Sequence, residues 1–196
     1  MHFVRRIRRG DGLKLKAIRL QALLTDPDAF GSSFQSESTR NDEEWEMRAV
    51  RGAEGDAQFL AVVEFDDEFV GMAGAYRPDD RPSTRELYGM WVAPQFRSAG
   101  IGSQLVAAVK EWGIQAEADE IDLWVVVDNQ AARRLYLEAG FLETDVSKPL
   151  PSNHSLTETR MTMPLTGTTR DPDTWSQSSI RGTQGDYQKG QPSGTV

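Results

Sequence analysis

The chain has 196 residues, of which 38% are hydrophobic, and this suits one globular domain with a sizeable core. Acidic residues outnumber basic ones by 30 to 22, which argues against a nucleic-acid-binding surface because such surfaces carry excess Lys and Arg. The resulting net charge of −8 suits a cationic substrate such as an amine, although acidity also serves solubility alone.

No cysteine is present, which excludes disulfides, thiolate metal sites and a cysteine nucleophile. No apolar run approaches the roughly 20 residues of a membrane span. The charged N-terminus is not followed by the long apolar stretch of a signal peptide. We therefore expect no membrane partner and a cytoplasmic location.

Hydrophobic periodicity divides the first half of the chain into alternating helices and strands. The predicted elements are a strand over 3–7, a helix over 13–24, a loop over 30–38, a helix over 42–50 and strands over 58–65 and 68–76. Asp26-Pro27 ends the first helix, and Asp66-Asp67 suits a tight hairpin between the two strands.

The second half continues with strands over 86–92, 121–127, 141–146 and 159–165, and with helices over 101–112 and 130–139. The nearly unbroken apolar run from Ile121 to Val127 is expected of a strand buried on both faces. Met161, Met163 and Leu165 alternate with polar residues and are predicted core positions of the last strand.

From Thr166 the composition shifts to Gly, Ser, Thr, Gln and Asp. Such a stretch buries too little apolar surface to offset the entropy lost on ordering. We therefore predict a domain over 1–165 and a disordered tail over 166–196. Trp175 and Tyr187 are its aromatic residues, and we interpret them as incidental rather than as a docking site.

A glycine-containing segment connects a predicted strand to a predicted helix. It consists of Arg97, Ser98, Ala99, Gly100, Ile101, Gly102 and Ser103. The first amides of a helix lack internal partners, and glycines let a phosphate approach them closely. Arg97 adds a full positive charge. The segment is suited to a pyrophosphate, although a glycine pair in this place can also be only a tight turn. It is not a Walker loop, because no Gly-Lys-Ser/Thr follows, and it is not the dinucleotide fingerprint, because Leu105 occupies the third glycine position.

A second motif follows, with Asn129, Ala132, Tyr136, Gly140 and Phe141 at fixed spacing. Together with Arg97-x-x-Gly100-x-Gly102, it closely resembles the GNAT superfamily of acetyl-CoA-dependent N-acetyltransferases. The resemblance extends to the order of elements and covers residues 3–165.

The resemblance implies an α/β fold: a mixed, twisted sheet of about seven strands with helices on both faces. In this family the fourth and fifth strands splay apart and hold the pantetheine arm between them. Carried over by position, Met90, Trp91 and Val92 would bind that arm, and residues 97–103 would hold the pyrophosphate. Asn129 would bind the cofactor, and Tyr136 would lie beside the sulfur and donate a proton to it.

Each of these residues also has a purely structural interpretation. Asn129 can be a helix N-cap, Tyr136 a core aromatic residue, and Gly140 the stop of the helix. Glu86, four residues before Met90, is the candidate general base, but it can equally be a solvated strand acid. Three other carboxylates compete for that role: Glu37, Glu43 and Glu44.

Two further groups of residues carry no predicted chemistry. His2 and His154 are the only histidines, and with no second ligand nearby we predict no metal site. The basic run of Arg5, Arg6, Arg8 and Arg9 is interpreted as solvated charge rather than as a binding patch.

The predicted reaction is direct attack of a neutral primary amine on the thioester of acetyl-CoA. A base or a water relay must first take the amine's proton. A backbone amide near Val92 would stabilise the oxyanion, and no covalent acyl-enzyme is needed.

A non-catalytic acyl-CoA sensor is the chief alternative to an enzyme, and Tyr136 argues against it. An enzyme acting on aminoacyl-tRNA is disfavoured by the acidity. The acceptor can be a protein N-terminus, a lysine, a polyamine or an amino sugar. The resemblance places its pocket near residues 30–45 and 144–158. A homodimer is left open.

Overall fold

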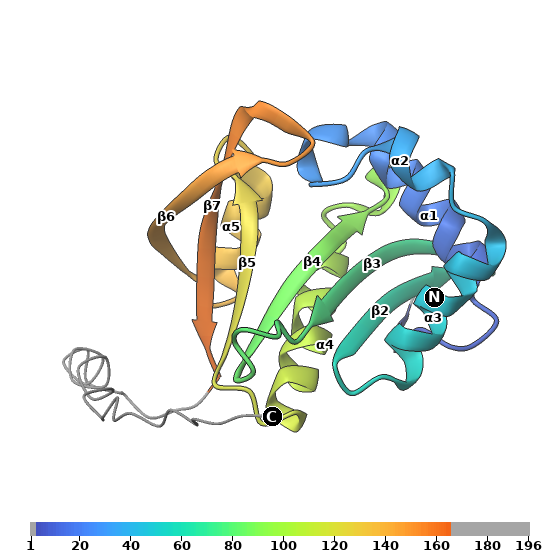
Figure 1. Cartoon of the computed structure of the whole chain (residues 1–196), viewed down its shortest axis with the longest axis horizontal. Coiled ribbons are helices and arrows are strands. Elements are labelled where there is room, and N and C mark those ends of the chain that lie inside the picture. Colours follow the sequence, from blue (N-terminus) through green and yellow to red (C-terminus); the bar gives the residue numbers. More distant parts are fainter. Residues whose placement is uncertain (1–2, 166–196) are drawn as a thin grey trace, which may run out of the picture. The chain divides into compact units, whose positions relative to one another are not determined.

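Seven strands form one mixed sheet in the order β1-β2-β3-β4-β5-β7-β6 (Figure 1) in a computed structural model that describes residues 3–165. The strands are β1 (Phe3–Arg6), β2 (Gln58–Phe65), β3 (Glu68–Tyr76), β4 (Thr84–Val92), β5 (Glu120–Val126), β6 (Leu142–Leu150) and β7 (Asn153–Pro164). Strands β4 and β5 are the parallel pair, and the other neighbours are antiparallel. The predicted mixed sheet is therefore confirmed.

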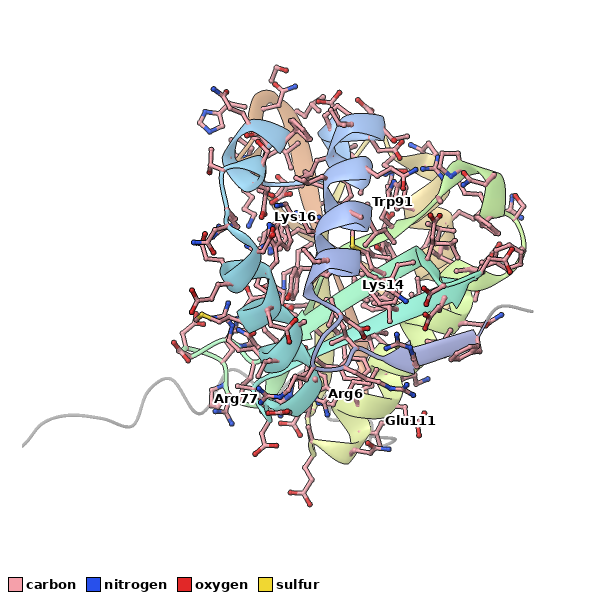
Figure 2. The ribbon with its side chains drawn as sticks, turned by 90° about the vertical axis from the view of Figure 1, so that its right-hand side faces the viewer. Arg6, Lys14, Lys16, Arg77, Trp91 and Glu111 are labelled. Carbon is pink, nitrogen blue, oxygen red and sulfur yellow. The ribbon has the colours of Figure 1, made fainter. Side chains whose placement is uncertain are left out.

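Helices cover both faces of this sheet (Figures 1 and 2). They are α1 (Gly12–Thr25), α2 (Phe34–Ser38), α3 (Asp42–Glu54), α4 (Ile101–Gln115) and α5 (Gln130–Glu138), with short 3₁₀ turns at Pro27–Ala29 and Pro94–Phe96. Helices α1 and α3 lie side by side and contact β3 and β2, while α4 packs across β1 to β5.

Two apolar clusters form the core, one on each side of the sheet. The α4 side holds Ile101, Leu105 and Val109, together with Tyr136 of α5. On the opposite side, α1 and α3 bury a second cluster around Trp45, which is fully buried. Strands β2 and β3 are buried on both faces, so their sequences are near-continuous apolar runs.

Ion pairs support the packing of α1. Lys14 pairs with Glu64 and Asp67 at the β2–β3 hairpin, and Lys16 pairs with Asp42 of α3 (both lysines are labelled in Figure 2). The hairpin turn, Asp66-Asp67, has φ values of 49° and 67°. Both lie in the left-handed region that two-residue hairpins require, so the predicted tight turn is confirmed.

Several predicted elements differ in extent from the structure, most of all one loop and the last two strands. Residues 30–38 were expected to be a loop, but Phe34–Ser38 form α2 because Ser33 and Ser36 cap each other's backbone amides. Strands β6 and β7 are also longer than predicted, and they meet in a hairpin near residues 150–153. Their extra residues are mostly polar and exposed, so hydrophobic alternation gave no signal for them.

The interpretation of the basic run as solvated charge is wrong for two of its residues. Arg5 is bonded to Asp11 and Glu64, and Arg6 donates to the carbonyl oxygens of Gly52 and Gln58. Arg5 therefore pairs with carboxylates at the start of α1 and on β2, and Arg6 satisfies backbone carbonyl groups of α3 and β2.

The predicted tail, 166–196, lies outside the described residues, as does His2. Within residues 3–165, no helix is long and apolar enough to cross a membrane.

Candidate active site

The sheet opens between its two parallel strands (Figure 1). Backbone pairing of β4 with β5 runs from Thr84–Glu120 to Leu87–Leu123 and stops there, although both strands continue. The amide of Ala93 bonds to β3, at 2.9 Å from the oxygen of Val70, so by strand alternation the amide of Val92 faces the opening. The opening therefore exposes an unpaired strand edge on β4.

A bulge in β4 lies beside this opening. The pairing of β3 with β4 shifts between Met72 and Gly74, and Gly89 adopts a φ of +61° there. A left-handed conformation of this kind favours glycine. Two pockets lie on either side of the bulge: Gly89 and the residues before it line one, and Met90 and the residues after it line the other.

The pocket lined by Met90 and the residues after it is here called the cofactor pocket, and its volume is about 530 Å³. Its lining contains these predicted cofactor residues: Met90, Trp91, Val92, Arg97, Ser98, Gly100, Ile101, Gly102, Ser103, Asn129 and Tyr136. Ala99 was predicted too, but it does not line the pocket. Asp26, at the end of α1, lines it and was not predicted.

The pocket is closed at one end by the N-terminus of α4. Gly100 is the N-cap with a φ of +75°, and no side chain caps the helix. The amides of the first turn are therefore free to bind an anion, aided by the helix dipole. A Cβ on Gly102 would lie 3.0 Å from Leu135 and 3.3 Å from Met90, so this glycine allows the helix to approach both residues.

Arg97 is held in place before any ligand binds. Its Nε donates to the carbonyl oxygen of Val92 at 3.0 Å, and its Nη2 bonds to Asp26. The same carboxylate accepts from the indole Nε1 of Trp91 at 2.7 Å. Asp26 therefore positions both the cationic loop and the buried Trp91. It lies 71 residues before Arg97, so no local motif could have identified it.

Asn129 and Tyr136 project from α5 into the same pocket. The Oδ1 of Asn129 accepts from the amide of Ala132 at 3.1 Å, so the residue is an N-cap, and its Nδ2 donor is the group that a cofactor contact would use. Tyr136 is buried, with its hydroxyl 3.5 Å from the Sδ of Met90. Burial raises the pKa of the Tyr136 hydroxyl above its ordinary value, so it stays protonated.

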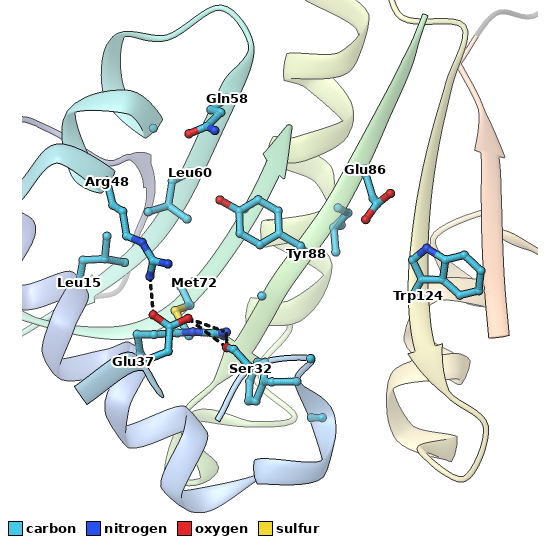
Figure 3. A pocket seen from close by; sticks show the side chains of 18 of the residues that line it. Leu15, Ser32, Glu37, Arg48, Gln58, Leu60, Met72, Glu86, Tyr88 and Trp124 are labelled. Carbon is cyan, nitrogen blue, oxygen red and sulfur yellow. Dashed lines mark hydrogen bonds and ion pairs between the residues drawn. The ribbon is translucent and has the colours of Figure 1, made fainter. Parts of the chain in front are cut away.

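The second pocket, here called the acceptor pocket, has a volume of about 510 Å³ (Figure 3). Residues from both predicted acceptor segments line it, among them Phe30, Ser32, Glu37, Lys148 and Glu158. Tyr88 and Trp124 also line it and were not predicted. In Figure 3, Tyr88 points from β4 toward the side that holds Arg48, whereas Glu86 points toward β5 and Trp124.

Two of the candidate bases lie in this pocket. Glu86 bonds to Arg81 at 3.0 Å and accepts from Tyr76, whose pKa is raised by burial and by this bond. Glu37 is 5% exposed and bonds to Arg48 at 2.7 Å. Burial alone would raise the pKa of Glu37, but the charges of Arg48 and Arg19 lower it below its usual range. The lowered pKa makes Glu37 a weak base, which is unfavourable for a general base working near neutral pH.

The remaining candidates lie elsewhere. Glu44 completes the N-terminal capping box of α3, and Glu43 is exposed on the same helix. His154 is exposed as well. Among residues 3–165, no group of three His, Asp or Glu side chains is arranged to hold a metal ion.

Comparison with known proteins agrees with this fold. The Acetyltransferase (GNAT) family model matches residues 20–141, which is more than half of the chain. The chain therefore belongs to the GNAT acetyltransferase family, and the predicted family is confirmed.

A relative in Archaeoglobus fulgidus, an uncharacterized N-acetyltransferase, is 31% identical over 85 residues. That match covers 41% of this chain and 58% of the relative, so the chain spans little more than half of the relative's length.

Solved structures show the same fold. A GNAT acetyltransferase of Streptococcus pneumoniae superposes with a TM-score of 0.72 at 20% identity, covering 84% of this chain and 99% of the other. The yncA protein of Salmonella typhimurium, solved with its cofactor acetyl-CoA, has a TM-score of 0.72 at 18% identity and covers 86% and 96%. At these identities the likeness concerns the fold.

Proposed function

We propose that this protein transfers the acetyl group of acetyl-CoA to a primary amine by direct attack in a ternary complex. The observation that carries the proposal is the meeting of two pockets at the β4 bulge, one built for an anionic cofactor and one lined by polar side chains. A protein that only binds an acyl-CoA needs the first pocket but not the second.

The cofactor pocket fits acetyl-CoA part by part. The free amides of the first α4 turn and the guanidinium of Arg97 suit the pyrophosphate. The unpaired edge of β4, from Met90 to Val92, suits the amide groups of a pantetheine arm. Asn129 would contact the arm from the opposite side of the opening through its Nδ2.

Two side chains would handle protons, one in each pocket. Acetyl-CoA supplies an activated acetyl group and a thiolate leaving group. Tyr136 is the proposed proton donor to the departing sulfur, since its hydroxyl is protonated near neutral pH and lies in the cofactor pocket beside Met90. Glu86 is the proposed acceptor of the amine's proton, directly or through water. The bonds from Arg81 and Tyr76 hold its carboxylate in the wall of the acceptor pocket.

Calorimetry with acetyl-CoA, followed by a screen of amines for thiol release, tests this function. We expect binding together with transfer to at least one amine. Binding without transfer to any amine would favour a non-catalytic sensor, and absence of binding would refute the assignment of the cofactor pocket. The cytoplasmic location and the homodimer stay predictions, which cell fractionation and sedimentation would check.

A further inference from the structure

The acceptor pocket is basic, although the whole chain has a net charge of −8. Its charged lining residues are Arg19, Arg48, Arg51 and Lys148 against Glu37, Glu86 and Glu158. Each carboxylate already has a cationic partner, in the pairs Glu37–Arg48, Glu86–Arg81 and Glu158–Lys148. A polyamine or an amino sugar would therefore have to compete with an existing ion pair for every carboxylate in this lining.

One wall of the pocket carries most of the excess charge. Within the lining, the carboxylate of Glu37 lies 2.7 Å from Arg48 and 3.8 Å from Arg19, so one negative charge faces two positive ones. Arg40 lies 3.1 Å from Glu37 but outside the lining, and it also pairs with Glu44. Arg51, on the next turn of α3 from Arg48, adds a third positive charge to the wall. This wall consequently attracts anions.

Arg19 is fixed in this wall with part of its hydrogen-bonding capacity unused. Its guanidinium stacks on Phe30, 4.5 Å from the ring centre, and its Nη2 donates to Ser32 at 2.9 Å. Its Nη1 is buried, and no acceptor among residues 3–165 bonds to it. That atom would lie 3.6 Å from a Cβ placed on Gly89, so the desolvated charge lies beside the β4 bulge.

Arg48 and Arg51 provide the accessible donors. Arg48 uses its Nη1 on Glu37, and 30% of its side chain remains exposed. Desolvation raises the pKa of the Tyr88 hydroxyl, and the charges of Arg48, Arg19 and Arg51, which line the same pocket, oppose that rise. A planar guanidinium fork matches a carboxylate in shape as well as in charge.

We propose that the acceptor is a small amino carboxylate, such as a free amino acid, whose carboxylate binds Arg48 and Arg51 in the field of Arg19. This inference rests on the proposed function and names the substrate class of the same pocket. A volume of about 510 Å³ suits a small molecule of this kind. Peptide N-termini and lysine side chains lack a carboxylate next to the amine.

Matched pairs of acceptors test the inference on the wild-type protein. Each amino acid is compared with the amine that lacks only its carboxylate: phenylalanine with phenethylamine, and lysine with cadaverine. We expect kcat/KM to be about tenfold higher or more for the amino acid, because a charge-assisted contact supplies that much discrimination. Equal rates, or faster acetylation of the carboxylate-free amines, would overturn the inference while leaving the proposed function intact.

Three substitutions assign the effect to the wall. Arg48→Gln should lower kcat/KM for the amino acid by about tenfold and change that for the amine less than about twofold. Arg51→Gln should act in the same direction by about threefold, and this exposed residue can be replaced without disturbing the fold. The matched control is Arg40→Gln, which also removes a partner of Glu37 but lies outside the pocket lining and should leave the preference unchanged.

A binding measurement separates failure of this inference from failure of the proposed function. If no amine is acetylated, the proposed function fails, and calorimetry with N-acetylphenylalanine and N-acetylphenethylamine still tests the wall. Tighter binding of the carboxylate, lost in Arg51→Gln, would support the anionic subsite. Equal binding of the two compounds, or a preference that survives both Arg48→Gln and Arg51→Gln, would reject it.

Discussion

The two pockets that flank the β4 bulge are built in different ways. The cofactor pocket is made mainly from two short stretches of chain, residues 90–103 and 129–138, and it offers largely backbone groups. The acceptor pocket gathers side chains from α1, α2, α3, β4, β5 and the β6–β7 hairpin. Backbone groups can bind the parts that all acyl-CoA donors share. The side chains of an acceptor pocket can differ from one protein to another and so match different acceptors.

The two pockets also differ in how their charged side chains are paired. In the cofactor pocket, ion pairs join Arg97 to Asp26 and Arg134 to Glu138, and neither involves the α4 amides. In the acceptor pocket the charged groups are bonded mostly to one another, around Glu37 on one wall and Glu86 on the other. Substitutions in the first should therefore change cofactor affinity, and substitutions in the second should change acceptor choice or stability.

The largest expected effect is on cofactor binding. Gly100→Glu places a carboxylate where we expect the pyrophosphate, at a position with a φ of +75° and no atom within 4 Å of an added Cβ. Loss of one or two charge-assisted contacts, together with charge repulsion, should weaken acetyl-CoA binding by about a hundredfold. Calorimetry measures this. Gly100→Ala introduces the backbone strain without the charge and should retain most of the affinity, and equal losses in both variants would contradict the assignment.

The next effect is on turnover. Tyr136→Phe keeps the ring, which packs edge-on against Phe141 at 5.6 Å, and removes a hydroxyl whose protein contact is the weak acceptor Met90 Sδ. Stability and acetyl-CoA affinity should persist, while kcat falls by about a hundredfold, near the lower end for a positioned acid. Because thiolate is a tolerable leaving group, some activity should remain. A variant that turns over like the wild type would identify Tyr136 as a packing residue only.

These two predictions concern residues that the sequence alone could identify. Gly100, Asn129 and Tyr136 lie in local motifs whose spacing follows from a strand, a loop and a helix in succession. Asp26 and Arg48 could not be found in this way, because the tertiary fold brings each to its partner. The missed helix α2 is an exception: Ser33 and Ser36 form a capping box that was readable from the sequence.

Glu86 illustrates the limit of sequence reasoning for the acceptor side. Its place four residues before Met90 suggested that it borders the acceptor site, and Glu86 lines the acceptor pocket. Alternation along the strand could have predicted Tyr88 as a second residue of this lining. Its bonds to Arg81 and Tyr76, however, depend on how a loop and a neighbouring strand pack. Side-chain chemistry of this kind is set by tertiary contacts.

The third prediction concerns the stability of the acceptor wall. Glu37→Gln should lower the free energy of unfolding at pH 7 by about 3 kcal/mol, since the guanidinium groups of Arg48, Arg40 and Arg19 lose the buried carboxylate that they face. The pKa of Glu37 is depressed in the folded state, so its contribution is present above the unfolded pKa and is lost as pH falls through the folded pKa. Urea unfolding at several pH values should show the wild type and the variant converging in acid. Glu43→Gln, on the exposed face of α3, is the control and should change stability by less than about 0.5 kcal/mol.

The smallest expected effect comes from removing the tail. Both pockets are lined by residues of the described part of the chain, 3–165, and the composition of 166–196 lacks core-forming residues. Deleting 166–196 should shift Tm by less than about 2 °C and leave acetyl-CoA affinity unchanged.

A slightly longer deletion provides the matched control. Leu165 donates its amide to the carbonyl oxygen of Asp119 at 2.8 Å and packs on the α4-side core. Deleting 164–196 removes these contacts, and the lost partial burial of one leucine together with a backbone hydrogen bond should cost about 1–2 kcal/mol. Thermal unfolding should therefore distinguish the two deletions clearly. Equal and large losses in both would mean that residues beyond Leu165 support the domain, and that the boundary predicted from composition is wrong.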